Sequence, residues 1–396
     1  MKNVNEIKNC YGCGVCATVC GKKIIEIGLN KEGFYEPRVI DPDRCVDCGL
    51  CLDVCSFLQQ EPSLLHTEIH SYAAWSKDVA VRRKCSSGGI GFELGRTLIE
   101  EGYKVCGVRY DAERARAEHY IATTMEELIP SIGSKYIQSY TVDGFKAINR
   151  KEKYLVTGTP CQIDSFRRYI QKFNVEDNFV LMDFFCHGVP SMRLWQKYLQ
   201  EVEKLTGEVT YVSWRNKFTG WHDSWAMAID GKERGEKVDW HDSYNLLIRG
   251  KKSFYNSRLS QGDSFYRFFL SDACLGKACY ERCKYKYDCS AADIRIGDLW
   301  GNTYKSNEDG VSAVVTFTEK GNKILRSCGC ELIEHPFNVV AEGQMKKCPR
   351  RPRLRSWILV RFCSDHSLRS TLIMYKLCCL PKRIINKLIR ILKWEK

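Results

Sequence analysis

The sequence predicts a chain of the α/β class, with a small α+β domain in front of the α/β domain and a basic helical tail behind it. Three observations predict this order: two matching runs of cysteine near the N-terminus, a strand–helix alternation in the middle, and a concentration of lysine and arginine at the end. They place the three parts at residues 1–62, 63–345 and 346–396. The length of 396 residues is sufficient for two or three domains.

The N-terminal cysteines form an internal repeat. CYGCGVCATVC begins at Cys10 and CVDCGLCLDVC begins at Cys45; both have the spacing C-x2-C-x2-C-x3-C. This is the bacterial ferredoxin spacing for 4Fe-4S clusters, in which the fourth cysteine of each run ligates the other cluster. A zinc site would need only one tetrahedral set of ligands. We therefore expect one cluster on Cys10, Cys13, Cys16 and Cys55, and a second on Cys45, Cys48, Cys51 and Cys20.

The number and context of the cysteines also indicate metal binding. The chain has 22 cysteines, and it opens MKNVNEIKNC, without the apolar segment of a secretory signal. This predicts a cytoplasmic protein, in which iron–sulfur ligation is favoured over a disulfide framework. No run reaches the roughly 18 apolar residues that a membrane-spanning helix needs.

The middle of the chain alternates between strand and helix patterns. We expect strands at 72–76, 104–110, 153–158 and 179–184, and helices at 92–101, 160–173 and 191–204. The alternation from 153 to 204 predicts parallel βαβ units. Residues 208–230 alternate between apolar and polar side chains, which predicts antiparallel strands.

Two cysteines follow predicted strands of this domain. Cys161, in GTPCQ, stands at a helix N-terminus, where the helix dipole favours a thiolate, and Cys186, in FFCHG, follows the next strand. Parallel strands bring both to the carboxyl edge of the sheet. A further group lies downstream, at Cys274, Cys279, Cys283 and Cys289. A third cluster could use this local group, or a dispersed set of Cys161, Cys186, Cys279 and Cys283, and spacing alone slightly favours the local group.

A small-residue loop, KCSSGG, precedes the first helix of the α/β domain. Its residues Ser86, Ser87, Gly88 and Gly89 could offer N–H groups to an anionic cofactor such as a phosphate, or could simply cap the helix. Lys135 could contact the same anion or be a solvated surface lysine. His187 could be a proton donor or an ordinary polar loop residue.

Several of these segments resemble a known family, the beta subunits of coenzyme F420-reducing hydrogenases and dehydrogenases. The matching segments occur in the family's order: RRKCSSGG, GSKYIQS, GTPCQ, DFFCHGVPS, WRNKFTGW, CYERC, DIRIGDLWG and GVSAVV. They cover about two thirds of the chain, from Tyr72 to about Asn338.

The resemblance implies a bound FAD near Ser86–Gly89 and Lys135, and a cluster in the same domain. It supports the dispersed ligand set of Cys161, Cys186, Cys279 and Cys283. The last pair is C-x3-C here, where the family has C-x2-C, so Cys274 and Cys289 stay in consideration.

The expected function is an iron–sulfur flavoprotein oxidoreductase. Electrons would pass between a hydride carrier, coenzyme F420 or another, and the N-terminal clusters by way of FAD and the third cluster. An electron-transfer partner protein or subunit is expected. Two alternatives are an adaptor subunit without its own substrate, and a ferredoxin-dependent reductase acting on a surface-polysaccharide intermediate.

The C-terminal tail carries the whole net charge of the chain. Residues 344–396 hold fifteen Lys and Arg against two acidic residues, which accounts for the net +13 and leaves the rest neutral. PKRIINKLIRILKWEK, from Pro381, predicts a basic amphipathic helix that contacts an anionic membrane peripherally or docks on protein. The Arg350–Arg355 run would add charge. Because the body is neutral, we do not expect nucleic-acid binding.

Overall fold

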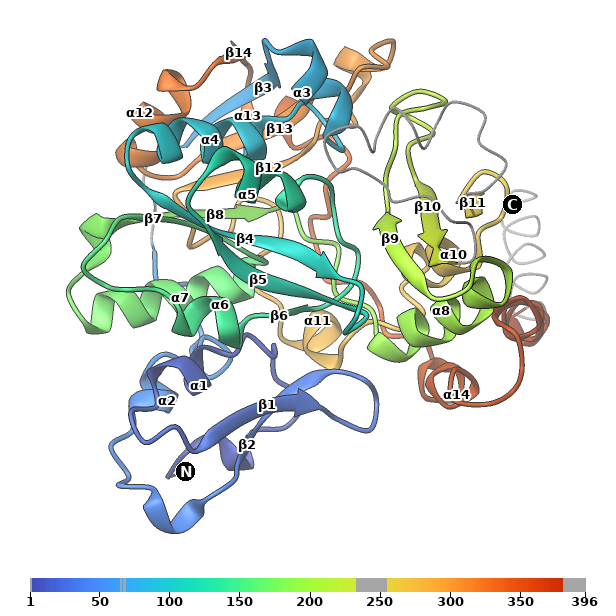
Figure 1. Ribbon diagram of the computed structural model, residues 1–396, viewed down its shortest axis with the longest axis horizontal. Coiled ribbons are helices and arrows are strands. Elements are labelled where there is room, and N and C mark those ends of the chain that lie inside the picture. Colours follow the sequence, from blue (N-terminus) through green and yellow to red (C-terminus); the bar gives the residue numbers. More distant parts are fainter. Residues whose placement is uncertain (1, 65, 67–68, 233–254, 380–396) are drawn as a thin grey trace, which may run out of the picture.

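The computed structural model describes residues 2–64, 66, 69–232 and 255–379. They form a nine-stranded mixed sheet covered by helices, a three-stranded sheet beside it, and a small domain at one end (Figure 1). The predicted mixed α/β class with a small N-terminal domain is confirmed. The amphipathic segment predicted from Pro381 lies outside the described residues.

The small domain is built from the two cysteine runs and a hairpin. Its elements are η1 (Val4–Glu6), α1 (Val15–Val19), β1 (Ile25–Leu29), β2 (Tyr35–Val39), η2 (Pro42–Arg44) and α2 (Leu50–Asp53). Each short helix starts after a glycine with a left-handed backbone, Gly14 at φ 74° and Gly49 at φ 73°. Other residues rarely adopt this conformation, so the glycine explains how each loop turns sharply between its second and third cysteine.

The large sheet has the strand order β14-β3-β13-β12-β8-β7-β4-β5-β6. Its strands are β3 (His70–Ser76), β4 (Lys104–Asp111), β5 (Arg116–Ala122), β6 (Ser139–Tyr140), β7 (Tyr154–Thr157), β8 (Phe179–Phe184), β12 (Ile294–Asp298), β13 (Ser312–Thr316) and β14 (Cys330–Glu334). Strands β4, β7, β8 and β12 are mutually parallel. The parallel pair of β7 and β8 is the one that the alternation from 153 to 204 predicts. β13, β3 and β14 continue the sheet in antiparallel pairs.

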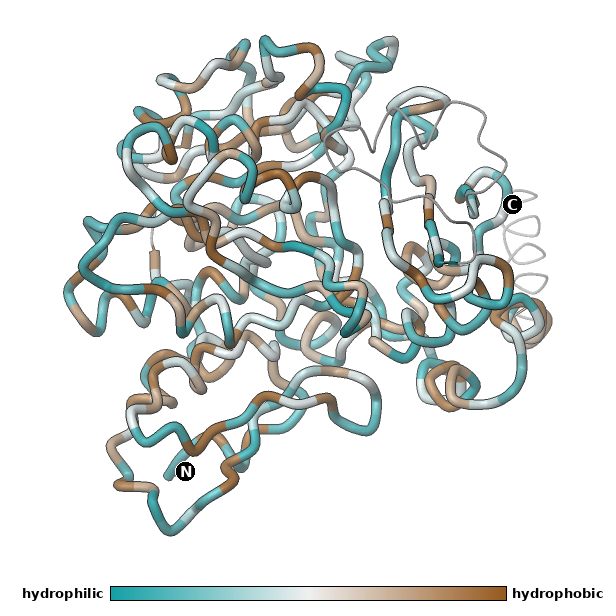
Figure 2. The backbone as a smooth tube through the Cα atoms, viewed as in Figure 1, coloured by the Kyte–Doolittle hydropathy of each residue, from teal (hydrophilic) through white to brown (hydrophobic). Residues whose placement is uncertain are grey.

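Helices cover both faces of this sheet (Figure 1). They are α3 (Val79–Lys84), α4 (Ile90–Glu100), α5 (Met125–Leu128), η3 (Ile129–Ser131), α6 (Val142–Lys146), α7 (Pro160–Lys172), η4 (Glu176–Asn178), α12 (Glu319–Ser327) and α13 (Phe337–Val340). Leu155 of β7 packs in the cluster of α4, whereas Val156 packs with α7. Because the central strands are buried on both sides, β7 and β8 are mostly apolar. The buried Asp183 of β8 is paired with Arg295 of β12 at 2.7 Å. Figure 2 shows this hydrophobic interior and the hydrophilic outer loops.

The predicted antiparallel strands form a separate sheet. Its strands are β9 (Val209–Ser213), β10 (Ala226–Gly231) and β11 (Tyr255–Arg258). They pack with the helices α8 (Met192–Thr206), α10 (Ser264–Leu270), α11 (Lys277–Glu281) and α14 (Arg355–Arg361). The short helix η6 (Asn302–Tyr304) lies elsewhere in the chain, after strand β12 of the large sheet. Ile358 and Leu359 of α14, and Phe362 directly after it, are buried in this core. The start of the predicted tail is therefore packed against the body. Of the described part of the chain, no helix is long and apolar enough to cross a membrane.

Candidate functional site

The cysteines of the small domain lie in two groups. Burial raises the pKa of Cys16 well above its ordinary value, and the nearby thiols of Cys13, Cys10 and Cys55 raise it further. Burial also raises the pKa of Cys51, and the nearby thiols of Cys20 and Cys48 raise it further. Cys55 thus lies close to the thiols of the first run, and Cys20 lies close to Cys51 of the second run. Cys45 lies in the loop of the second run and its Sγ accepts a hydrogen bond from Asn3 Nδ2 at 3.5 Å.

A third group of cysteines lies at the carboxyl ends of β7 and β8. Cys161 opens helix α7, and burial raises the pKa of its thiol well above the ordinary value. Cys186, Cys279 and Cys283 surround it and raise this pKa further. Burial raises the pKa of Cys186 to about 12. The structure therefore brings together the dispersed set.

The two other cysteines of the local set lie differently. Cys274 is fully buried in the core around α8 and α10, and its carbonyl accepts a hydrogen bond from Ser191 N at 2.9 Å. Burial is the main cause that raises the pKa of Cys289, and the negative charge of Asp288 is the next. Cys283 of the third group raises this pKa only slightly. Cys274 thus belongs to the apolar core rather than to this group.

Cys348 lies beside the third group, although its spacing gave no reason to expect it there. Its Sγ lies 3.0 Å from the carbonyl oxygen of Cys283. A hydrogen bond from Cys348 lowers the pKa of Cys283 below the ordinary thiol value, against the effect of burial. Lys286 adds a positive charge beside the group, since its Nζ donates to the carbonyl oxygens of Cys186 at 2.6 Å and His187 at 3.0 Å.

The third group fits an iron–sulfur cluster. A cavity of about 50 Å³ opens among these buried thiols, and Cys10 and Tyr11 of the small domain line its other side. Within the described ranges, no three His, Cys, Asp or Glu side chains are placed to hold one metal ion. A four-iron cluster takes one thiolate per iron and does not require ligands to meet at a single ion.

A larger cavity of about 510 Å³ lies next to the third group. It opens at the carboxyl edge of the sheet, between the loop before α4 and the aromatic side chains of Tyr136, Trp225 and Trp300. The rings of Tyr136 and Trp225 stack with centroids 4.8 Å apart. Its volume and its apolar walls are typical of a small-molecule or cofactor site, and they fit a flavin.

The predicted anion loop borders this cavity. Ser86, Ser87 and Gly89 line it, and the hydroxyl oxygen of Ser86 accepts a hydrogen bond from Ser134 N at 2.9 Å. Gly89 has φ 93° and precedes the first residue of α4. Gly88 instead packs under the sheet, where a Cβ would lie 2.3 Å from the carbonyl oxygen of Ala74. Gly88 therefore allows a close backbone approach and does not line the cavity.

Lys135 lines the cavity but its amino group points into protein. Its Nζ donates to the carbonyl oxygens of Pro130, Ser131 and Ile132, each at 3.0 Å. Burial lowers the pKa of Lys135 to about 7, while the three acceptors match the three donors of an ammonium group. Lys135 is thus not a solvated surface lysine; it holds the 130–135 loop that forms one wall of the cavity.

The cavities and cysteine groups form a continuous series. Cys186, Gln162 and Tyr285 line both cavities, so the larger cavity and the third group share a wall. On the other side, the hydroxyl group of Tyr11 donates to the carbonyl oxygen of Arg282. The smaller cavity therefore lies between the third cysteine group and the start of the first run, at Cys10 and Tyr11.

Three protein-family models match this sequence. Residues 71–145 match the N-terminal model and residues 151–332 the C-terminal model of the coenzyme F420 hydrogenase/dehydrogenase beta subunit. The chain belongs to this family. Residues 9–57 match the 4Fe-4S dicluster domain, so the small domain is hereafter the dicluster domain.

Individual relatives of this chain carry related names. A coenzyme F420-dependent sulfite reductase from Methanocaldococcus jannaschii is 23% identical over 329 residues, which are 81% of this chain and 46% of the relative. A coenzyme F420 hydrogenase subunit beta from Methanococcus voltae is 36% identical over 72 residues, 17% of this chain and 26% of the relative. The chain thus spans about half the length of the first of these. A chain of the F420-reducing [NiFe] hydrogenase complex from Methanosarcina barkeri has a TM-score of 0.45 at 18% identity, covering 80% of this chain and 95% of that one.

Proposed function

We propose that this chain is an iron–sulfur flavoprotein that passes electrons between a hydride carrier and the clusters of its dicluster domain. The observation that supports this proposal most directly is the shared wall between the larger cavity and the third cysteine group. A two-electron site beside a one-electron centre is what such a conversion requires. The carrier is coenzyme F420 or a similar hydride donor, in keeping with the family.

The same geometry supports a proposal for the cofactors and their ligands. FAD occupies the larger cavity, beside Ser86, Ser87, Gly89 and Lys135, with Gly88 behind the loop. When bound, it accepts a hydride and gives up electrons singly. The third cluster is held by Cys161, Cys186, Cys279 and Cys283. The two dicluster sites are held by Cys10, Cys13, Cys16 and Cys55, and by Cys45, Cys48, Cys51 and Cys20.

The chain's own residues prepare the larger cavity for this chemistry. Trp225, Tyr136 and Phe269 exclude water from one wall. His187 lines the cavity and its Nε2 lies 2.8 Å from Asp272 Oδ1, so Asp272 holds the ring of a residue that can exchange a proton at the site. Lys286 lines both cavities and places a positive charge between them.

Electrons leave or enter at the far end, through the second cluster of the dicluster domain. Cys48 is exposed, and its neighbour Val46 is 61% exposed. An electron-transfer partner protein or subunit meets the chain there. The C-terminal segment supplies a second contact, peripheral attachment to an anionic membrane, since Val360, Ile373 and Leu377 leave apolar side chains on the surface ahead of the basic residues that follow.

The composition of the purified protein tests this function. Anaerobically purified full-length chain should contain iron and sulfide for three four-iron clusters and one FAD, with the matching visible absorption. Flavin is the decisive component, because an adaptor subunit without a substrate would hold clusters alone. Three clusters without any flavin would replace the proposed function by that adaptor role.

A further inference from the structure

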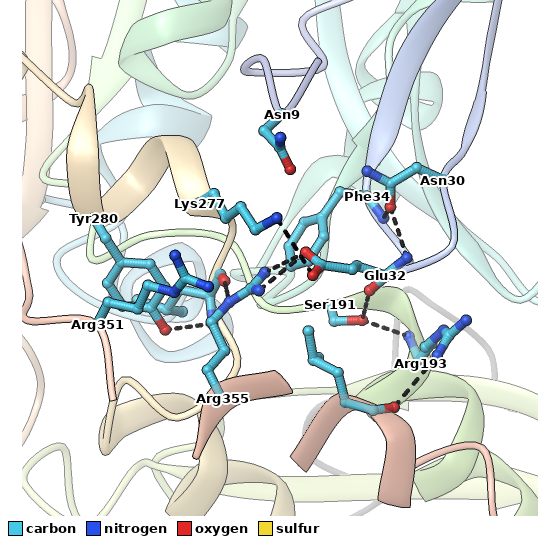
Figure 3. Close-up of polar contacts among 12 residues, drawn as sticks. Asn9, Asn30, Glu32, Phe34, Ser191, Arg193, Lys277, Tyr280, Arg351 and Arg355 are labelled. Carbon is cyan, nitrogen blue, oxygen red and sulfur yellow. Dashed lines mark hydrogen bonds and ion pairs between the residues drawn. The ribbon is translucent and has the colours of Figure 1, made fainter. Parts of the chain in front are cut away.

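A buried ion pair holds the tip of the β1–β2 hairpin of the dicluster domain. Glu32 Oε2 accepts hydrogen bonds from Nη1 and Nη2 of Arg355, each at 2.9 Å (Figure 3). Arg355 is fully buried, and the Glu32 side chain is 27% exposed. Lys277 Nζ lies 3.6 Å from Glu32 Oε1. Removing one partner of such a pair would leave the other charge buried and uncompensated.

The same contacts reach the two segments that carry the third cysteine group. Lys277 opens helix α11, which contains Cys279. Ser191, at the end of the loop that begins with Cys186, donates its hydroxyl hydrogen to the carbonyl oxygen of Glu32 at 2.6 Å. Arg355 Nε donates to the carbonyl oxygen of Leu275, just before α11, at 2.8 Å. The hairpin is therefore tied to both segments at once.

Close packing completes this contact. Gly33, beside Glu32, has φ +81°, and a Cβ there would lie 2.6 Å from Ser191 Oγ, so only glycine allows this approach. The guanidinium carbon of Arg355 lies 5.4 Å from the ring centroid of Phe34 and 6.0 Å from that of Tyr280. Aromatic rings on two segments thus flank the one cation.

We propose that Glu32 and Arg355 are positioning residues for electron transfer between the third cluster and the dicluster domain. They fix the hairpin against the segments of Cys186 and Cys279, and so fix the separation of the two centres. The step moves one electron; the third cluster is oxidised, the neighbouring dicluster centre is reduced, and no bond changes. This inference rests on the proposed function.

The test compares Glu32→Gln with Glu208→Gln in the anaerobic full-length holoprotein. Glu208 is a matched control because its ion pair with Lys232, at 2.6 Å, is exposed at 58% and 63% and lies outside the dicluster contact. Three quantities are measured: iron and sulfide content, the magnetic coupling between reduced clusters by EPR, and the rate at which the dicluster centres become reduced from the larger cavity. Hydrogen exchange of residues 30–34 and 275–281 is followed in parallel.

We expect Glu32→Gln to keep its iron and sulfide, to weaken the magnetic coupling, and to slow dicluster reduction several-fold, with faster exchange in both segments. Glu208→Gln should behave as wild type. Unchanged coupling and rate in Glu32→Gln would overturn the proposal, and so would loss of the third cluster itself, which would make Glu32 an assembly residue. A wild-type chain without a third cluster would instead contradict the proposed function, a result read from the iron content alone.

A double variant adds an independent comparison. Replacing both partners, Glu32→Gln with Arg355→Met, removes the buried charge together with its partner, so the double variant should be no worse than either single variant in coupling and rate. Effects that simply add would show that the two residues act separately and would overturn the joint role.

Discussion

Cys13 of the dicluster domain lies 3.3 Å from Ser165 of helix α7, measured from Sγ to Oγ. Ser165 also donates to the hydroxyl oxygen of Ser56 at 2.7 Å, and Ser56 Oγ donates to the carbonyl oxygen of Cys161 at 3.2 Å. A proposed ligand of the first cluster is therefore in contact with the helix that carries a proposed ligand of the third. Helix α7 thus connects the proposed first cluster with the proposed third cluster.

The first prediction concerns the dicluster domain. Cys13→Ser and Cys48→Ser should each lower the iron and sulfide content, because each thiolate is both a ligand and part of the local fold. Cys13→Ser should also lower the thermal midpoint more than Cys48→Ser, since Cys13 contacts α7 whereas Cys48 is exposed. Iron analysis and a thermal melt measure both effects. Full iron content in both variants would remove the ligand assignment.

The second prediction separates the two ligand sets of the third cluster. Cys161→Ser and Cys186→Ser should each lose that cluster, whereas Cys274→Ser and Cys289→Ser should keep it, because Cys274 lies in the apolar core. Cys348→Ser should also keep the iron, since Cys348 contacts Cys283 rather than joining the four. EPR of the reduced proteins identifies the lost cluster. The local set would be correct if Cys289→Ser lost the cluster while Cys161→Ser kept it.

The third prediction concerns the flavin. Gly91, in the first turn of α4, lines the larger cavity, and a Cβ there would meet only the side-chain ends of Ile296 at 3.2 Å and Met182 at 3.6 Å. Gly91→Ala should therefore retain FAD. Gly91→Leu should fill the cavity and lose FAD while it keeps its iron. Flavin released by acid is measured by fluorescence, and equal flavin in the two variants would place the cofactor elsewhere.

The fourth prediction concerns acid stability. His119 is 2% exposed, its Nε2 lies 2.9 Å from the carbonyl oxygen of Thr157, and burial lowers its pKa from 6.5 to about 4. Between these pH values the unfolded chain binds more protons than the folded one, so the unfolding free energy falls as the pH falls from 6.5 toward 4. Glutamine does not titrate, so the melting temperature of His119→Gln should fall less between pH 7 and pH 5 than the melting temperature of the wild type. Equal losses would show that His119 does not contribute.

The fifth prediction concerns the membrane. Arg355 is paired with Glu32, and Ile358 and Leu359 are core residues, so a truncation before residue 350 would damage the body itself. A chain ending at residue 379 is the proper comparison. The full chain should sediment with anionic vesicles at low salt and be released as salt rises, whereas the shorter chain should stay in solution. Equal sedimentation would leave docking on protein as the role of the segment.

Local patterns predicted much of this molecule, and long-range contacts supplied the rest. The β7–α7–β8 unit followed from the alternation of apolar runs, and the capping box of Thr159 and Gln162 marks the start of its helix. The sequence could not choose between the two cysteine sets, because β12 pairs with β8 and so brings a distant segment to Cys186.

Charge was the least predictable feature. Arg355 reads as one of a run of surface cations, yet it is buried against Glu32, 323 positions away in the chain. The hydrogen bonds of Lys135 to three carbonyl oxygens are likewise set by the path of the 130–135 loop. Such pairings depend on tertiary structure, so the spacing of residues in the sequence cannot predict them.

The most direct test of the proposed electron path is reduction of the dicluster centres from the larger cavity. A hydride donor, reduced coenzyme F420 first, is added anaerobically to wild type and to Cys161→Ser, and flavin absorbance and cluster EPR are followed together. We predict that the flavin is reduced in both proteins but that the dicluster centres are reduced only in wild type, although dithionite reduces them in both. Dicluster reduction at the same rate in Cys161→Ser would contradict the path through the third cluster.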